Sequence, residues 1–437
     1  MELKERMQSA GILGAGGAGF PSYAKLAKGA DTLVVNGAEC EPLLYTDYHL
    51  LKRELALTLV GIEAVLAEGN MSRALLAVKQ HTAEKLKWTD GQVLAEKIAV
   101  KVLPNVYPMG DEISLIYEAT GRVVKPGNLP ITAGVIVMNV ETVWNVGNAV
   151  RFGKPVLETW LTIGGDLPQP ITLKVPVGTP VATVFEKYGV SVPETHTLLD
   201  GGPSMGRVID PDTAVITKTT KGLLVLPNSS AAVQSKYIDA KKSVARAETA
   251  CCQCTRCTDM CPRYLLGYPL EPHKMVRTAM SAAELLPQMV ITANLCCGCG
   301  ICETLACCQG ISPKAVITQY KDVIAKHKMR YVATDEVNAR EERDWRMVPS
   351  EKWESVLGVR LYDRPSVWKE EPLAIPRVEI SLKPHIGAPS IPCVKDGDRV
   401  KAGDVVAEAG AGLSIAQHAS IDGVAYVEKD RIIIYKD

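Results

Sequence analysis

The chain has 437 residues, of which 47% are hydrophobic and 22% charged, a composition typical of a globular protein with about two to four domains. Lys+Arg and Asp+Glu number 49 each, so no overall field attracts polyanions, and we expect no nucleic-acid partner. The first residues are charged, and no apolar run approaches the roughly 20 residues of a membrane span. We therefore expect a cytoplasmic protein without a membrane span.

The first part of the chain, residues 1–152, alternates between strand and helix patterns. Apolar runs at 30–36, 73–79 and 99–103 predict strands, and residues 21–28 and 54–68 have the composition or period of helices. This alternation predicts a mainly parallel, Rossmann-like α/β sheet. Four glycines between Gly14 and Gly19 precede the first helix. Such a loop either cradles a phosphate or is only a packed glycine turn.

Polar residues follow the ends of three predicted strands in this first domain. Glu39 and Glu41 follow the first strand, and segments 107–112 and 137–142 repeat the pattern. Ligands of open α/β sheets bind at the carboxyl ends of the strands, so these residues and the glycine loop predict a nucleotide site. Residues 153–235 then show short strands, a helix near 181–188 and turn residues. They predict a compact β-rich unit.

The cysteines identify the third domain, residues 236–330. Eleven of the 13 cysteines lie between Cys251 and Cys308. The first run has the spacing C-x2-C-x2-C-x3-C-P of bacterial ferredoxins, and a second run follows a helical connector at 264–289. The alternatives are two zinc sites or buried free thiols. We favour two 4Fe-4S clusters, with ligands Cys251, Cys254, Cys257, Cys261, Cys296, Cys299, Cys302 and Cys307.

The fourth ligand of each cluster is less certain than the first three. In two-cluster ferredoxins the fourth cysteine of one run binds the other cluster, which assigns Cys261 to the second cluster and Cys307 to the first. The remaining doublet partners, Cys252, Cys297 and Cys308, are expected to be packing residues, although Cys308 rivals Cys307 as a ligand. Single-electron transfer is the chemistry that such clusters supply.

The C-terminal part divides into two segments. Residues 331–375 are charged and aperiodic and predict a linker over the surface, whereas residues 376–437 predict short strands and turns. The hairpin at 418–423 contains no lysine, so we expect no covalent carrier function.

Four motifs in the N-terminal domain resemble the FMN-binding segments of the flavin subunit of respiratory complex I and of the Rnf-complex C subunit. These are segments 14–25, 36–42, 110–112 and 139–142. The resemblance implies that Phe20 lies near the nicotinamide of NADH, and that Glu39, Glu41 and Glu112 lie near its ribose or the flavin edge, with Glu39 and Glu112 as catalytic residues. The implied FMN contacts are Gly14, Gly16, Gly17, Lys25, Asn36, Glu39, Gly110, Asp111, Asn139 and Thr142.

The remaining domains carry the resemblance over nearly the whole chain. Residues 153–235 resemble the soluble-ligand-binding β-grasp (SLBB) domain, as a spacer or as a corrinoid site. Residues 376–437 resemble a lipoyl-like barrel-sandwich hybrid. In the Rnf-complex C subunit the corresponding sandwich is N-terminal, whereas here it is C-terminal. This order resembles the cobalamin reductases of bacterial propanediol-utilisation microcompartments.

The resemblance implies that NADH reduces FMN, and that two 4Fe-4S clusters pass single electrons to cobalamin or another one-electron acceptor. FMN suits this position because it exchanges either one or two electrons. A microcompartment shell protein and an adenosyltransferase are the implied partners, and a microcompartment the implied location. The alternatives are an Rnf-like NADH:ferredoxin electron-transfer protein and a non-catalytic electron-wire or shell-docking protein.

Overall fold

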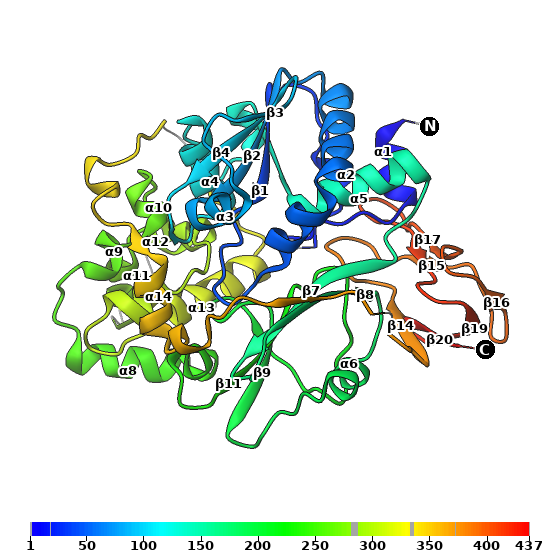
Figure 1. Cartoon of the computed structure of the whole chain (residues 1–437). Coiled ribbons are helices and arrows are strands. Elements are labelled where there is room, and N and C mark those ends of the chain that lie inside the picture. The colour runs from blue at the N-terminus through cyan, green and yellow to red at the C-terminus, as the bar shows by residue number, and fades with distance from the viewer. Residues whose placement is uncertain (1, 18, 281–286, 333–335, 372, 437) are drawn as a thin grey trace.

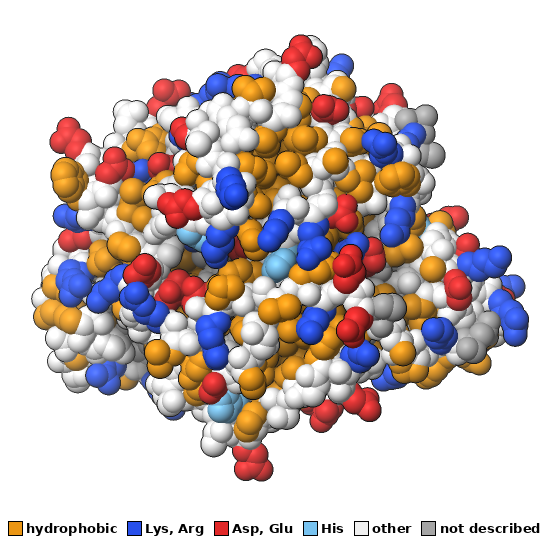
Figure 2. All heavy atoms as spheres, viewed as in Figure 1, with side chains coloured by type: hydrophobic (Ala, Val, Ile, Leu, Met, Phe, Trp, Pro, Cys, Tyr) orange, Lys and Arg blue, Asp and Glu red, His pale blue; other side chains and the backbone are white. Residues whose placement is uncertain are grey.

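A computed structural model describes residues 2–17, 19–280, 287–332, 336–371 and 373–436 (Figure 1). Two sheets occupy its centre, with helices α8–α13 on one side and the C-terminal strands on the other. Charged side chains of both signs are interspersed over the face shown in Figure 2. Among the described residues, no helix combines the length and apolarity needed to cross a membrane.

The first domain is built on a five-stranded sheet in the order β3-β4-β2-β1-β6. All strands run parallel except β3, which pairs antiparallel at the edge. The predicted parallel α/β sheet is therefore confirmed. Its strands are β1 (Thr32–Gly37), β2 (Arg73–Lys79), β3 (Val93–Ala95), β4 (Ile98–Leu103) and β6 (Val135–Asn139).

Helices cover both faces of this sheet, and α2 (Thr46–Gly69) packs closely against α5 (Val140–Phe152). A Cβ at Gly61 would overlap the carbonyl oxygen of Val143, and one at Gly147 would overlap that of Leu57. The helix expected at 21–28 is shorter, the 3-10 turn η1 (Ser22–Lys25). The remaining elements are α1 (Leu3–Ser9), α3 (Gln80–Leu86), β5 (Val106–Tyr107), α4 (Glu112–Thr120) and η2 (Pro130–Ala133).

The second sheet has six strands in the order β10-β9-β11-β7-β8-β13. Helix α6 (Val181–Tyr188) packs its apolar face on this sheet through Val184 and Phe185. The β-rich unit expected at 153–235 is thus present, while its β-grasp assignment stays a prediction. The strands are β7 (Glu158–Gly165), β8 (Ile171–Pro176), β9 (His196–Asp200), β10 (Arg207–Val208), β11 (Gly222–Pro227) and β13 (Val367–Lys369).

The cysteine-rich domain is helical, with α8, α11 and α13 around a core that includes Met275, Val316 and Ile317. The connector expected at 264–289 is helical in part as α11, and residues 281–286 lie outside the described residues. The helices are α7 (Ala231–Gln234), η3 (Ser235–Tyr237), α8 (Ala240–Ala250), α9 (Arg256–Asp259), α10 (Pro262–Leu265), α11 (Pro272–Met280), α12 (Pro287–Ile291), η4 (Thr292–Leu295), η5 (Cys302–Ala306) and α13 (Pro313–Lys326).

The segment expected to be a surface linker is instead integrated into the fold. Strand β12 (Val348–Pro349) pairs with β5, and β13 pairs with β8 at the edge of the second sheet. Trp353 of α14 (Ser350–Leu357) is 1% exposed and stacks on Tyr107, with ring centroids 4.7 Å apart. These elements escaped prediction because each is short and its partners lie far away in the sequence. Two 3-10 turns, η6 (Glu341–Arg343) and η7 (Arg360–Tyr362), complete the segment.

The C-terminal domain consists of two small sheets, ordered β14-β20-β19-β16 and β15-β17-β18. They enclose an apolar core that includes Val378, Val406 and Ile432. The expected short strands and turns are therefore found. The strands are β14 (Arg377–Ser381), β15 (Ile391–Pro392), β16 (Arg399–Val400), β17 (Val405–Glu408), β18 (Gln417–His418), β19 (Gly423–Val427) and β20 (Arg431–Tyr435).

Candidate functional site

The glycine-rich loop connects α1 to η1 and lies against the start of α5. The Gly14 amide donates to the carbonyl of Phe20 at 2.8 Å, and the Ala15 amide donates to Thr142 Oγ1 at 3.0 Å. Gly16 and Gly17 are exposed, and a Cβ at Gly17 would meet no atom within 4 Å. With its φ of +100°, Gly17 presents bare backbone on which a phosphate or flavin fits.

The ends of β1 and β6 bring Asn36 and Asn139 together as directly paired residues. Asn139 Nδ2 donates to the Asn36 carbonyl at 3.3 Å, and Asn36 Nδ2 donates to the Gly110 carbonyl at 3.0 Å. Asn139 Oδ1 also caps α5 by accepting from the Glu141 amide at 2.9 Å. The structure thus gathers three of the expected FMN contacts at the carboxyl edge of the first sheet.

Lys25 reaches from η1 to the same edge. Its Nζ donates to Glu112 Oε1 at 2.9 Å and to the Val137 carbonyl at 3.0 Å. The side chains of Lys25 and Glu112 are 30% and 39% exposed, so this ion pair is solvated and can open for a ligand. Phe20 is half-buried at the end of the glycine-rich loop.

The carboxylate of Glu39 is directed at the N-terminus of α2. Its Oε1 accepts from the Asp47 amide at 2.9 Å, and its Oε2 accepts from the Tyr48 amide at 3.4 Å. Burial, followed by the negative charge of Asp47, raises the pKa of Glu39 to about 8. A carboxyl group that keeps its proton near neutral pH can donate a hydrogen bond to a ligand.

Two charged residues of this region, Asp47 and Lys221, were missed by the sequence analysis. Asp47 Oδ2 accepts from Asn139 Nδ2 at 3.4 Å, and Lys221, just before β11, forms a buried ion pair with Glu141. Burial lowers the pKa of Lys221 to about 8, while the charges of Asp47 and Glu39 oppose that shift. Only Asp47 had a local signal, as an acid in the first turn of a helix.

Glu41 and Asp111 both link the first domain to other parts of the molecule. Glu41 accepts from the amides of Ser204 and Met205 at 2.8 and 3.1 Å, and burial raises its pKa. Asp111 caps α4 and forms an ion pair with Arg263 of α10 at 2.7 Å. Both carboxylates have partners outside the first domain, whereas Glu112 pairs with Lys25 inside it. The contact with Arg263 had no signal in the sequence.

Five cysteines line one cavity in the third domain, and four of them are expected cluster ligands. Three of these four are buried, and Cys296 is half-buried. Burial and the charges of Cys296, Glu303 and Cys261 raise the pKa of Cys302. Because four thiols converge on one cavity, the set fits a 4Fe-4S cluster, with three ligands from the second run and one from the first. This inner cysteine group consists of Cys261, Cys296, Cys299 and Cys302.

The remaining expected ligands form a second set, the outer cysteine group. Burial, followed by the charges of Cys307, Cys254 and Cys251, raises the pKa of Cys257 to about 12. This set also combines three cysteines of one run with one of the other, in the exchange pattern of two-cluster ferredoxins. It is more accessible than the inner group, because Cys254 is exposed and the others are half-buried. The outer cysteine group consists of Cys251, Cys254, Cys257 and Cys307.

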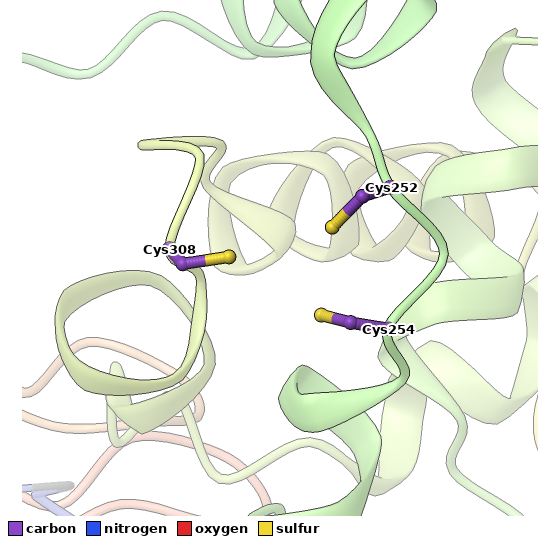
Figure 3. Close-up of side chains that lie close together, drawn as sticks. All are labelled: Cys252, Cys254 and Cys308. Atoms are coloured by element: carbon purple, nitrogen blue, oxygen red, sulfur yellow. The ribbon is translucent and has the colours of Figure 1, made fainter.

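Two of the doublet cysteines do not pack as expected. The Sγ atoms of Cys252, Cys254 and Cys308 lie within 4.8 Å of one another and point toward each other (Figure 3). All three residues are exposed, which contradicts a packing role for Cys252 and Cys308. Cys297, by contrast, lines the cavity of the inner cysteine group. Cys308 thus remains a rival to Cys307.

Comparison with known families supports the cofactors expected for these sites. The Nuo51 FMN-binding domain matches residues 7–148, a 4Fe-4S dicluster domain matches residues 250–312, and the RnfC barrel sandwich hybrid domain matches residues 370–433. The chain therefore carries a flavin domain, an iron-sulfur domain and a C-terminal barrel sandwich. The predicted multidomain α/β fold and the FMN and 4Fe-4S cofactors are confirmed at this level.

Two relatives match along nearly the whole chain. Cobalamin reductase PduS of Citrobacter freundii is 37% identical over 97% of this chain and 93% of its own length. The protein of the same name from Salmonella typhimurium is 36% identical over 99% of this chain and 96% of its own length. The C subunit of the Na(+)-translocating ferredoxin:NAD(+) oxidoreductase complex of Acetobacterium woodii is 31% identical over 60% of this chain and 58% of its own length. The chain belongs to the family of PduS cobalamin reductases.

Proposed function

We propose that this chain reduces cobalamin with electrons taken from NADH. The observation that carries the proposal is the direct contact between the flavin domain and the cysteine domain. Asp111 pairs with Arg263 at 2.7 Å, and the Tyr107 hydroxyl donates to the carbonyl of Cys299 at 2.8 Å. Asp111 belongs to the expected FMN segment 110–112, and Tyr107 begins the polar stretch 107–112 that contains this segment. The proposed hydride acceptor and one-electron carriers would thereby lie in two domains that contact each other directly.

Within this proposal the two cysteine groups each bind one 4Fe-4S cluster. The flavin would be held by the glycine-rich loop and by the residues gathered at the carboxyl edge of the first sheet. Phe20, Glu39 and Glu112 would face the nicotinamide nucleotide. The proposed FMN contacts are Gly14, Gly16, Gly17, Lys25, Asn36, Glu39, Gly110, Asp111, Asn139 and Thr142.

The residues of the site have distinct tasks in this chemistry. Bound FMN accepts a hydride from NADH and releases electrons singly. Lys25 supplies the positive charge beside the loop, and its pairing with Glu112 keeps that charge in place when no ligand is bound. Glu39 holds a proton near neutral pH at the N-terminus of α2 and orients polar groups of the nucleotide. Gly16 and Gly17 would position the flavin ring against these side chains.

The setting of the reaction is also part of the proposal. A corrinoid acceptor implies a B12-dependent enzyme that consumes the product, and the relatives' family implies a shell protein, an adenosyltransferase and a microcompartment as the surroundings. The similarity to the C subunit of the Acetobacterium woodii complex favours a second function, the transfer of electrons between NADH and ferredoxin.

Anaerobic spectroscopy of protein reconstituted with FMN, iron and sulfide tests the proposal. NADH should bleach the flavin absorbance, and aquacobalamin added next should be reduced while NADH is consumed. Flavin that stays oxidised in the presence of NADH would contradict the proposal and favour an electron wire. Bleaching followed by reduction of ferredoxin, but not of aquacobalamin, would favour the second function.

A further inference from the structure

The two cysteine groups differ in how deeply they are buried. In the inner cysteine group Cys261, Cys299 and Cys302 are 8%, 7% and 8% exposed. The outer cysteine group reaches the surface at Cys254, where the thiols of Cys252 and Cys308 are exposed as well (Figure 3). A soluble acceptor can therefore approach the outer cysteine group directly, whereas protein covers the inner one.

The inner cysteine group is also the one that touches the flavin domain. The Tyr107 hydroxyl donates to the backbone carbonyl of Cys299. Arg263, two residues after Cys261, pairs with Asp111. Residues Tyr107–Met109 also share a cavity with Pro262 and Ile301, each the neighbour of an inner cysteine. Among the described residues, no side-chain hydrogen bond joins the outer cysteine group to the segment 107–112.

We propose that electrons pass from the flavin site to the inner cysteine group first, and that they leave through the outer cysteine group. The corrinoid then docks at the exposed surface formed by Cys252, Cys254 and Cys308. Electron tunnelling weakens steeply with distance, so the group in contact with the flavin segment receives electrons first. The inference rests on the proposed function, because it assumes that both groups hold clusters.

The electron count is balanced by two acceptors for each donor. NADH releases two electrons and one proton as it becomes NAD⁺. Each of two aquacobalamin molecules, which contain cob(III)alamin, takes one electron and becomes cob(II)alamin, so the two electrons leave the outer cysteine group one at a time. The exposed surface needs to hold only one corrinoid at any moment.

Cluster-deficient variants give the first test. Cys299→Ala removes an inner ligand and Cys257→Ala an outer ligand, while Cys393→Ala, in the C-terminal domain, is the matched control. Electron paramagnetic resonance spectra are recorded after NADH and after dithionite, which reduces clusters directly. In Cys299→Ala, dithionite should reduce the remaining cluster, and NADH should bleach the flavin yet leave that cluster oxidised. In Cys257→Ala, NADH should reduce the remaining cluster, with loss of aquacobalamin reduction.

Reduction of the remaining cluster by NADH in Cys299→Ala, at the rate of the control, would overturn the proposed order. Wild-type protein gives a second test that depends on no variant. After mixing with NADH, samples are frozen at successive times in the presence of a soluble gadolinium chelate, which speeds the spin relaxation of exposed centres. The signal that develops second should be the one that the chelate affects.

If the chelate affects the signal that develops first, the order is reversed and the inference fails. These outcomes are separate from failure of the proposed function. If the proposed function itself is wrong, NADH will leave the flavin of the wild-type protein oxidised, or aquacobalamin will stay unreduced although both clusters accept electrons.

Discussion

The residue that most changes the view of the flavin site is Glu39. Its carboxyl group sits at the N-terminus of α2 with Asp47 beside it, and Lys221 comes from the second sheet. Three ionisable groups with shifted pKa values in one buried place mark a functional site more often than a structural one. These three ionisable residues also make the stability of the first domain depend on pH.

We predict that Glu39→Gln flattens this dependence. The pKa of Glu39 is raised to about 8, above the usual 4.5 of a free carboxyl group. Between these values the folded chain keeps a proton that the unfolded chain loses, so the stability supplied by protonation disappears as the pH rises through that window. Glutamine has no such proton to lose. The melting temperature of the variant should fall less between pH 5.5 and 8.5 than that of the wild type, by about 1–3 °C.

Glu63→Gln is the matched control, because Glu63 is exposed on the same helix α2. It should follow the wild-type curve at both pH values. If the melting temperature falls equally in Glu39→Gln and in the wild type, Glu39 of the folded chain is ionised throughout this pH range.

At the residue scale, we predict that substitutions of the adjacent residues Cys307 and Cys308 have different effects on bound iron. Cys307 is among the thiols that raise the pKa of Cys257, whereas Cys308 faces Cys252 and Cys254 at the surface. Cys307→Ala should therefore lose about half of the bound iron, and Cys308→Ala should retain nearly all of it. Iron and acid-labile sulfide per chain decide the question. The reverse pattern would make Cys308 the ligand.

At the scale of elements, the pair α2 and α5 sets the geometry of the flavin site. The N-terminus of α2 holds Glu39, and that of α5 carries Asn139 and Thr142. The two helices approach closely because glycines stand at the crossing, where any side chain would meet a backbone carbonyl. The spacing of the two helix N-termini is thus fixed by Gly61 and Gly147, which are not among the proposed FMN contacts.

Gly61→Val should test this fixed spacing. The added side chain has no room against the carbonyl of Val143, and we expect a loss of about 3 kcal/mol or more in the free energy of unfolding. Flavin affinity should fall as well, since the helix ends move apart. Circular dichroism during heating and flavin fluorescence measure the two effects. Glu63→Val adds a branched residue to an exposed position of α2 and should change the free energy of unfolding and the flavin affinity only slightly. If Glu63→Val loses as much stability as Gly61→Val, the low helix propensity of valine is the cause instead.

At the scale of the whole molecule, the flavin and cysteine domains are joined by a buried ion pair. Arg263 and Asp111 have side chains only 10% and 12% exposed. Removing one partner of such a pair leaves an uncompensated charge, which costs about 3–5 kcal/mol. The union of the two domains is therefore sensitive to single substitutions at this contact.

We predict that Arg263→Met lowers the melting temperature and slows cluster reduction by NADH, while the rate of flavin bleaching stays unchanged. Adding Asp111→Asn should restore part of the stability, because the stranded charge disappears. Stopped-flow spectroscopy follows the two reductions separately. Arg277→Met, at an exposed position of α11, is the control. If the double variant is less stable than Arg263→Met, the ion pair does not account for the loss.

The sequence predicted the features that depend on local pattern or spacing. The parallel sheet, the convergence of Asn36 and Asn139, and the two cysteine runs all follow from short motifs. Contacts between distant segments left no such signal. Arg263 lies 152 positions from Asp111, and Lys221 meets Glu141 only after the second sheet has folded against the first domain. The same limit hid β12 and β13, because their pairing partners lie far earlier in the chain.

The late position of α14 in the chain has a consequence for biosynthesis. A ribosome releases the chain from its N-terminus, so all eleven cysteines between Cys251 and Cys308 emerge before α14, whose Trp353 and Leu357 share an apolar cluster with Cys299 of the inner cysteine group. During that interval the scaffold around the cysteines is incomplete, and their thiols are accessible to iron and sulfide donors. We therefore expect iron and sulfide to reach the inner cysteine group more easily before α14 docks than after it.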